Sequence, residues 1–385
     1  MKNQDNAMAI LHYENYTALP VVHFGFWTET LQKWAAEGHI TKDDADSWED
    51  CSNADIRIGK ALGFDFNWGQ NFGPHYRLDP PFERKILEED SEGNMKVLNV
   101  DGVIVMEKRN VVSIPSEVDH FFKGRTEWES GFKDRLLFSS ERFMNSLVPA
   151  GDHTRNLEAG GWDYLKDTTD RKRPLGLFAG SLIGFIRDFV GVENLSYLTI
   201  DDPELLVEMV NHVADLSYNT VKAILDTGAK FEYMHFWEDV CFKNGPLIHP
   251  HFFRDVIGPQ YKRITDLALS HGIDIVSVDC DGMIDHLLPV WLENGVNTMF
   301  PIEVGTWKAS IAPWREQYGT DLRGVGGMNK TVFSHDRKAI EDEVERLKPL
   351  VDLGGYIPCP DHRIAPDAKW DNVRYYCDLM RKNFG

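Results

Sequence analysis

From about residue 174 the chain alternates short apolar runs with longer amphipathic stretches, and this rhythm constrains the fold more than any other feature. We expect strands at 175–178, 231–237, 273–278, 297–304, 322–326 and 355–358, with helices between them such as 203–225 and 336–353. Strands that alternate with helices of this length pair in parallel through right-handed crossovers. The pattern therefore predicts an α/β fold made of repeated strand and helix units.

An earlier apolar run, LPVVHF at 19–24, supplies a further strand, and no glycine-rich phosphate-binding turn follows it. These units fit a closed (β/α)₈ TIM barrel with an N-terminal extension better than an open sheet. Residues 64–130 are less regular. Apolar and polar positions alternate on both sides of Ser91-Glu92-Gly93-Asn94, which predicts a β-hairpin insertion near the barrel mouth. We expect residues 1–385 to form a single domain, in which about 64–130 covers one mouth.

The chain is acidic, with 61 Asp and Glu against 41 Lys and Arg and a formal net charge of −20. Such a charge argues against nucleic acid as a partner. The only dense basic run, Arg171-Lys172-Arg173, is short and is expected at the solvated surface. Because the sequence has neither a targeting segment nor a long apolar stretch, we expect a cytoplasmic protein without membrane contact. Whether it forms a homo-oligomer is left open.

Polar residues follow the predicted strands at the barrel end where the chemistry of such folds takes place. They are Glu238, Asp239 and Cys241; Asp279, Cys280 and Asp281; Asn329 and Lys330; and Cys359, Asp361 and His362. Thiolates together with carboxylate or imidazole ligands suit Zn²⁺, which leaves one position open when it is catalytic. We therefore predict a zinc site formed by Cys280, Cys359 and Glu238.

Other interpretations of these residues stay open. The third ligand could instead be one of five neighbours: His235, Asp239, Cys241, Asp279 or Asp281. The cysteines could equally be small buried hydrophobes, the commonest role of a free cysteine, and Cys51 and Cys377 are expected to be structural. His362 could orient a ligand or bind an anionic substrate, or could be a surface residue.

Aromatic residues concentrate near the predicted mouth and would suit a flat aromatic ligand. They are Phe26, Trp27, Trp68, Phe72, Phe236 and Trp237. Aromatic stripes are also common in cores, so packing is the competing interpretation. We expect Trp27, Phe236 and Trp237 to contact the substrate.

Several stretches resemble the uroporphyrinogen decarboxylase-like superfamily, especially its corrinoid-dependent methyltransferase branch. They are GFWTETLQKWAAEG at 25–38, WEDVCFKNGPLIHPHFFRDVIGPQYKRI at 237–264, VDCDG at 278–282, ENGVNTMFPIEV at 293–304, GGMNK at 326–330 and GGYIPCPDHRIAPDAKWDNVRYY at 354–376. The resemblance is spread over most of the chain and implies a (β/α)₈ barrel.

The chain departs from that superfamily in two places. The decarboxylases carry N-terminal arginines that hold a polycarboxylate substrate, but the first arginine here is Arg57, and residues 10–39 hold only Lys33 as a strong cation. The methyltransferases bind zinc through an HxC pair and a later cysteine, which Cys359 matches. The HxC position reads Asp279-Cys280-Asp281 in this chain, so the implied zinc site is richer in oxygen.

The resemblance implies a zinc-dependent methyltransferase that moves a methyl group from an aryl methyl ether to the Co(I) corrinoid of a partner protein, as in an O-demethylase system. Asp279, Asp281 and His362 would supply a proton to the leaving oxygen or orient a ring substituent. Three alternatives remain: a methylcorrinoid:thiol methyltransferase, a uroporphyrinogen decarboxylase-type enzyme, and a non-catalytic barrel that binds a tetrapyrrole or a corrinoid protein.

Overall fold

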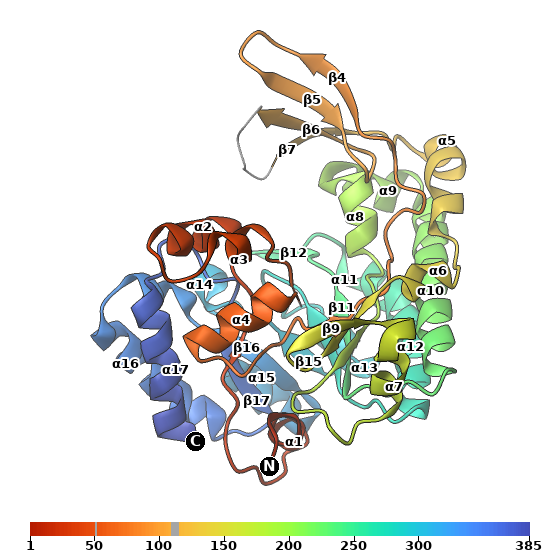
Figure 1. Ribbon diagram of the computed structural model, residues 1–385. Helices are drawn as coiled ribbons and strands as arrows, with labels where there is room; N and C mark the ends of the chain where they lie inside the picture. The colour runs from red at the N-terminus through yellow and green to blue at the C-terminus, as the bar shows by residue number, and fades with distance from the viewer. Residues whose placement is uncertain (51, 109–114) are drawn as a thin grey trace.

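A ring of parallel strands forms the centre of the computed structural model, which describes residues 1–50, 52–108 and 115–385 (Figure 1). Its strands are β1 (Val22–His23), β2 (Phe66–Asn67), β3 (Asn71–Phe72), β10 (Gly176–Phe178), β11 (Tyr233–Trp237), β14 (Val276–Asp279), β15 (Thr298–Phe300), β16 (Arg323–Met328) and β17 (Tyr356–Pro360). Seven of them pair in the order β17-β16-β15-β14-β11-β10-β3. β1 pairs with β2, and a bridge between Phe26 and Ile364 joins the first and last segments. The predicted (β/α)₈ barrel is confirmed.

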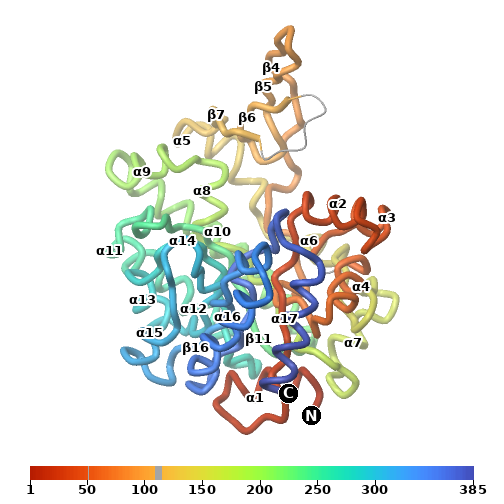
Figure 2. Tube along the Cα trace, turned by 90° about the vertical axis from the view of Figure 1, so that its left-hand side faces the viewer, coloured from red at the N-terminus to blue at the C-terminus, as the bar shows by residue number. Residues whose placement is uncertain are grey.

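Helices surround the ring on its outside (Figures 1 and 2). The main ones are α8 (Gly184–Val190), α9 (Val192–Asp201), α10 (Pro203–Leu225), α12 (Gly258–Ser270), α13 (Leu288–Glu293), α15 (Ile311–Tyr318), α16 (Arg337–Val351) and α17 (Trp370–Phe384). Local signals set their ends: the Asp202 carboxylate accepts a hydrogen bond from Leu205 N at 3.0 Å before α10, and Pro203 occupies its first turn. Cys377 of α17 is buried, as predicted, whereas Cys51 lies outside the described residues. None of the helices in the described ranges is long and apolar enough to cross a bilayer.

The N-terminal extension closes the amino end of the barrel. Helix α1 (Asn3–Leu11) lies below the strands in Figure 1. Its last turn is tied to the barrel, because Ile10 O accepts from Gly355 N at 3.0 Å and Leu11 O accepts from Arg323 Nε at 2.6 Å. Helices α2 (Thr28–Ala36), α3 (Lys42–Asp46) and α4 (Asn53–Leu62) follow β1 and lie toward the opposite end.

The insertion is a four-stranded antiparallel sheet, larger than the hairpin that the sequence predicts. It consists of β4 (Lys85–Glu89), β5 (Asn94–Leu98), β6 (Val103–Lys108) and β7 (Ser116–His120), in that order. The predicted hairpin is its first pair, whose turn is fixed by the Asp90 carboxylate accepting from the backbone N–H of Glu92 and Asn94. The sheet projects beyond the barrel on the side of α2 and α3 (Figures 1 and 2). Residues 109–114 of the expected insertion lie outside the described residues.

The basic run at 171–173 is only partly solvated: Lys172 is exposed, as the sequence suggests, but Arg171 is not. Arg171 is fully buried, and its guanidinium donates to the Glu232 carboxylate at 3.0 Å and to Tyr164 O at 3.0 Å. The same carboxylate accepts from Leu175 N at 2.7 Å. The pair therefore links the segments that precede β10 and β11.

Candidate active site

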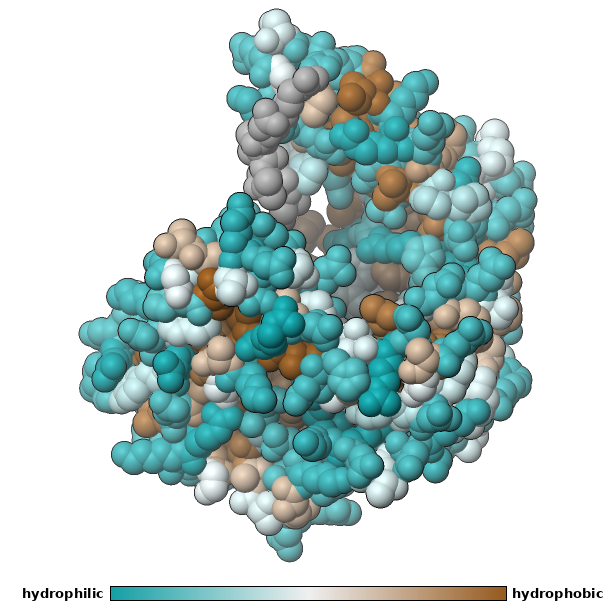
Figure 3. Space-filling model, in the orientation of Figure 1, coloured by the Kyte–Doolittle hydropathy of each residue, from teal (hydrophilic) through white to brown (hydrophobic). Residues whose placement is uncertain are grey.

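A cleft of about 1220 Å³ opens at the carboxyl ends of the barrel strands. Figure 3 shows the hollow on this face, between the N-terminal helices and the base of the projecting sheet. Trp27, Trp237, Asp279, Asp281 and His362, which the sequence predicts as site residues, all line this cleft. This is the end of a parallel barrel at which catalytic residues gather.

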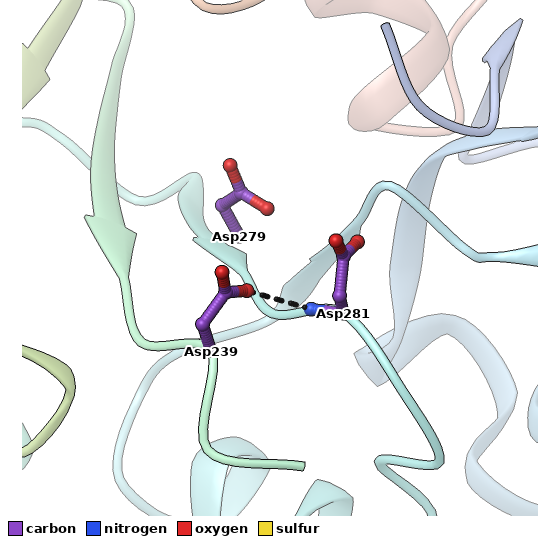
Figure 4. A group of neighbouring side chains, drawn as sticks. All are labelled: Asp239, Asp279 and Asp281. Carbon is purple, nitrogen blue, oxygen red and sulfur yellow. Dashed lines mark hydrogen bonds between the residues drawn. The ribbon is translucent and has the colours of Figure 1, made fainter. Parts of the chain in front are cut away.

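Three aspartates form the centre of the cleft. Asp279 ends β14, Asp281 follows two residues later, and Asp239 lies in the turn after β11 with a positive φ of 45°. Their carboxylate oxygens lie within 4.8 Å of one another. Figure 4 shows the three side chains side by side at the two strand ends, where the Asp239 carboxylate accepts a hydrogen bond from Asp281 N at 3.1 Å. We call Asp239, Asp279 and Asp281 the aspartate trio.

Crowding and burial of the carboxyl groups shift the pKa values of Asp239 and Asp279. Burial raises the pKa of Asp239 to about 6, and the charge of Asp281 adds to the rise. Burial also raises the pKa of Asp279 well above its ordinary value, with the charges of Asp239 and Asp281 as further causes. Carboxylates this close cannot all stay ionised without a compensating charge. The trio is therefore suited either to hold protons or to bind a cation.

His362 stands beside the trio, in the loop after β17. Its Nε2 lies 3.3 Å from Asp281 Oδ2, and its ring stacks on Trp27 with centroids 5.6 Å apart and an interplanar angle of 17°. His362 Nδ1 and Asp281 Oδ1 are both buried and have no hydrogen-bond partner among the described residues. Polar atoms left in this state are costly unless a ligand or water engages them. These atoms indicate that the site accepts a polar ligand.

The two sides of the cleft are aromatic. On one side Phe24 meets His362 edge to face at 5.7 Å between centroids and Phe300 at 4.5 Å. On the other side Trp237 packs against Phe185 at 5.5 Å, and the Arg77 guanidinium lies 4.3 Å from the Phe185 ring centre. A flat aromatic ligand fits between two such walls.

Glu238, the predicted third zinc ligand, faces away from the cleft and is fully buried. Its carboxylate accepts hydrogen bonds from Ser181 Oγ at 2.9 Å, from the backbone N–H groups of Leu182, Ile183 and Gly184 at 2.9, 3.0 and 2.9 Å, and from the Tyr261 hydroxyl. Burial raises the pKa of Glu238, and these hydrogen bonds oppose the rise. With its oxygens occupied, Glu238 anchors the start of α8 rather than facing a metal.

The predicted cysteine ligands also lie outside the cleft. Cys280 is 3% exposed, its Sγ lies 3.6 Å from Asp281 O, and it contacts Cys241. Cys359 is fully buried. Burial raises the pKa of both thiols, which disfavours the thiolate that a metal needs. Phe236, predicted to contact the substrate, is fully buried against Tyr261 at 5.1 Å between centroids.

The structure therefore does not bring Glu238, Cys280 and Cys359 together as one ligand set. Within the described part of the chain, the aspartate trio is the group whose ligand atoms are close enough to hold a metal ion. Its all-oxygen donor set fits a divalent cation that prefers carboxylates, and it does not fit a thiolate zinc site.

The comparisons with known proteins agree with this architecture. The sequence model of the family described as uroporphyrinogen decarboxylase (URO-D) matches residues 160–383. The chain belongs to this family. The match runs from before β10 to the end of α17 and includes the trio and His362. Among curated proteins, none matches the chain.

Two solved structures align with the chain over most of its length. A methyltransferase from Methanosarcina mazei aligns over 100% of this chain and 99% of its own, with a TM-score of 0.59 and 15% identity. A B12-independent methionine synthase from Shewanella sp. W3-18-1 aligns over 95% of this chain and 99% of its own, with a TM-score of 0.45 and 11% identity. The first of these supports the barrel fold, and function has to be argued from the site.

Sequence reasoning gave little weight to some cleft residues. Asp239 was only one of several alternative ligands, although its place directly after a strand was the available signal. Phe24 ends the predicted strand at 19–24 but was not singled out, and Arg77 comes from an irregular segment, where no periodic pattern points to the cleft.

Proposed function

We propose that this URO-D family protein is a cation-assisted methyltransferase that moves a methyl group from an aryl methyl ether to the Co(I) corrinoid of a partner protein. The observation that supports the proposal is the aspartate trio between aromatic walls at the carboxyl end of the barrel. The shared fold with a methyltransferase from Methanosarcina mazei is consistent with it. A cytoplasmic location and the corrinoid-carrying partner are parts of the same proposal.

Asp239, Asp279 and Asp281 would hold the cation. A divalent cation at the trio would supply Lewis-acid stabilisation of the negative charge that develops on the ether oxygen. Carboxylate ligands favour Mg²⁺ or Mn²⁺, and Zn²⁺ also accepts carboxylate oxygens. Zinc therefore stays in the proposal with aspartate ligands in place of the predicted cysteines.

The other site residues orient the substrate and handle the proton. Trp27 and Trp237 enclose the substrate ring and exclude water from it. His362, held by Asp281 and by its stacking on Trp27, would carry on Nε2 the proton that the leaving oxygen takes up. No side chain of the site has to accept the methyl group.

Metal content tests the cation site. Elemental analysis would compare the wild type with Asp279→Asn and Asp281→Asn, after dialysis against Mg²⁺, Mn²⁺ or Zn²⁺. Cys280→Ser and Cys359→Ser are the matched controls, because these residues are buried beside or near the site without facing it. We expect about one cation per chain, lost in the aspartate variants and kept in the cysteine variants. If the cation is lost in the cysteine variants alone, the zinc site formed by thiolates would become the better interpretation.

Methyl transfer tests the reaction. The wild type would be incubated with reduced cobalamin and a panel of methoxyarenes, and loss of the Co(I) absorption would report methylation. We expect turnover that depends on the cation and falls strongly in Asp281→Asn. A protein that binds a cation but methylates no cobalamin with any methoxyarene would refute the proposed reaction.

Decarboxylation of a polycarboxylate is the second candidate, because the family is named for it and three arginines line the cleft. Each of these arginines already faces an aspartate: Arg57 pairs with Asp44, Arg77 with Asp188 and Arg363 with Asp50. Little free positive charge is left for a polyanion. Release of CO₂ from uroporphyrinogen would favour this candidate. Methylation of a thiol by methylcobalamin would favour the thiol methyltransferase instead. Binding of a tetrapyrrole or a corrinoid protein without turnover would favour the non-catalytic barrel.

A further inference from the structure

A buried histidine lies at the floor of the cleft, below the aspartate trio. His235 is on β11, is 5% exposed and lines the cleft. Its Nδ1 lies 3.2 Å from the hydroxyl oxygen of Ser277 on the neighbouring strand β14. Asp279 follows Ser277 by two residues and points to the same face of β14, so it lies about 7 Å further along the strand.

The hydrogen bonds around Ser277 favour the tautomer of His235 that carries its proton on Nε2. Ser277 is fully buried, and its Oγ accepts from Trp68 Nε1 at 3.4 Å. Indole N–H is a donor only, so His235 Nδ1 is the acceptor available to the serine hydroxyl proton. A neutral imidazole that accepts at Nδ1 carries its proton on Nε2. Burial lowers the pKa of His235 to about 3, which keeps the ring neutral.

Nε2 has no hydrogen-bond partner among the described residues and is not one of their fully buried unpaired atoms, so its N–H is open to the cleft that His235 lines. The ring lies between Phe178 and Phe300, at 6.4 and 5.9 Å between centroids. Phe300 in turn packs on Phe24, which contacts His362 beside the trio. One aromatic wall therefore runs from His235 at the floor of the cleft to His362 beside the trio.

We propose that His235 Nε2–H donates a hydrogen bond to a neutral oxygen on the substrate ring, and that the enzyme therefore selects methoxyarenes with a second, uncharged oxygen substituent over methoxybenzoates. This inference rests on the proposed function. A carboxylate on the ring would add a negative charge beside the three carboxylates of the trio, and the cleft arginines Arg77 and Arg363 are already paired with Asp188 and Asp50. A neutral ether or phenol oxygen satisfies the donor without adding charge to the buried floor.

A pair of nearly isosteric ligands tests the hydrogen bond. 1,2-Dimethoxybenzene and 1-ethyl-2-methoxybenzene differ by one oxygen in place of one CH₂ group, and calorimetry would give their Kd ratio for wild type, His235→Gln and His235→Phe. We expect the ratio to shift against the dimethoxy ligand by about two- to tenfold in His235→Phe, the range of one neutral hydrogen bond. His235→Gln, which keeps an N–H donor, should retain most of the wild-type ratio. We also expect 4-methoxybenzoate to bind the wild type more weakly than either neutral ligand.

An unchanged ratio in His235→Phe, or no binding of either neutral ligand to the wild type, would overturn the inference. Nitrogen-15 NMR of the wild type is independent of any variant: the histidine should be the Nε2–H tautomer throughout pH 5–8, and the opposite tautomer would also overturn it. Ligand binding is measured without a corrinoid, so the proposed reaction and the proposed role of His235 can be refuted independently of each other. The expected ratios without methyl transfer would refute only the reaction, and methyl transfer with unchanged ratios would refute only the role of His235.

Discussion

Replacing Glu238 with glutamine separates a structural role from a role as metal ligand. Glu238 Oε1 accepts from Leu182 N at 2.9 Å and from the Tyr261 hydroxyl, and Oε2 accepts from the other three donors. Glutamine offers one oxygen, so its NH₂ group must take one of these two places. At Oε1 the tyrosine hydroxyl can turn to accept, although its own proton then loses its acceptor, and Leu182 N–H is left facing another donor.

The cost follows from that geometry. One stranded buried donor costs about 1–3 kcal/mol, so Glu238→Gln should lower the free energy of unfolding by at least that amount. Glu238→Ala leaves all of the donors without their acceptor and should cost more. Cation content at the trio should not change, because the carboxylate faces the start of α8 and not the cleft.

Urea denaturation followed by tryptophan fluorescence measures the loss, with elemental analysis of the same samples. Glu316→Gln is the matched control, since Glu316 is exposed on α15, and it should stay within about 0.5 kcal/mol of wild type. If Glu238→Gln is as stable as this control, the hydrogen-bond account fails. If it stays folded but loses the cation, Glu238 is a ligand after all.

Three further predictions concern the core and the cleft. Arg171→Met should cost about 3–5 kcal/mol because it leaves the Glu232 carboxylate buried without its partner, and the same denaturation should show part of the loss recovered in Arg171→Met/Glu232→Gln. Burial lowers the pKa of His23 from 6.5 to about 3, so on acidification the unfolded chain takes up the proton first and stability falls as the pH drops from about 7 toward 3. His23→Gln should therefore reduce the loss of unfolding free energy between pH 7 and pH 5 by about 2 kcal/mol, measured by denaturation at both pH values. Trp27→Leu should raise KM for a methoxyarene more than Trp27→Phe, because leucine loses the ring that stacks on His362; equal KM values in the two variants would show that the stacking is irrelevant.

The barrel could be predicted because its signals are local. The strand and helix rhythm after residue 174 survives in the structure, and α10 has the predicted bounds, since Asp202 and Pro203 are capping signals within the segment itself. Strand bounds such as 297–304 were too long, because β15 ends at Phe300, a bend follows at Pro301 and helix begins at Val304. The size of the insertion depends on pairings between segments that no local pattern reveals.

The site was less predictable because it depends on which face a residue takes at the end of a strand. Alternation along β11 puts His235 and Trp237 toward the cleft and turns Phe236 and Glu238 outward, where both are fully buried. Likewise Asp279 and Asp281 face the cleft, with Cys280 between them turned away. The distant loop that supplies the donors to Glu238, and the irregular segment that supplies Arg77, could not be located from sequence spacing.

Glu238 and Asp239 are adjacent, but they face opposite sides of the barrel wall. The first is fastened to the start of α8, and the second stands in the trio directly after β11. Many residues that shape the cleft come from other segments than the carboxylates: the trio lies at the ends of β11 and β14, whereas Phe24, Trp27, Arg77 and Phe185 come from loops and from α8, with Trp237 on β11 itself. Changes in those outer segments could therefore alter which substrate the cleft accepts while β11 and β14 stay as they are, and this arrangement offers a route to redesign its substrate range.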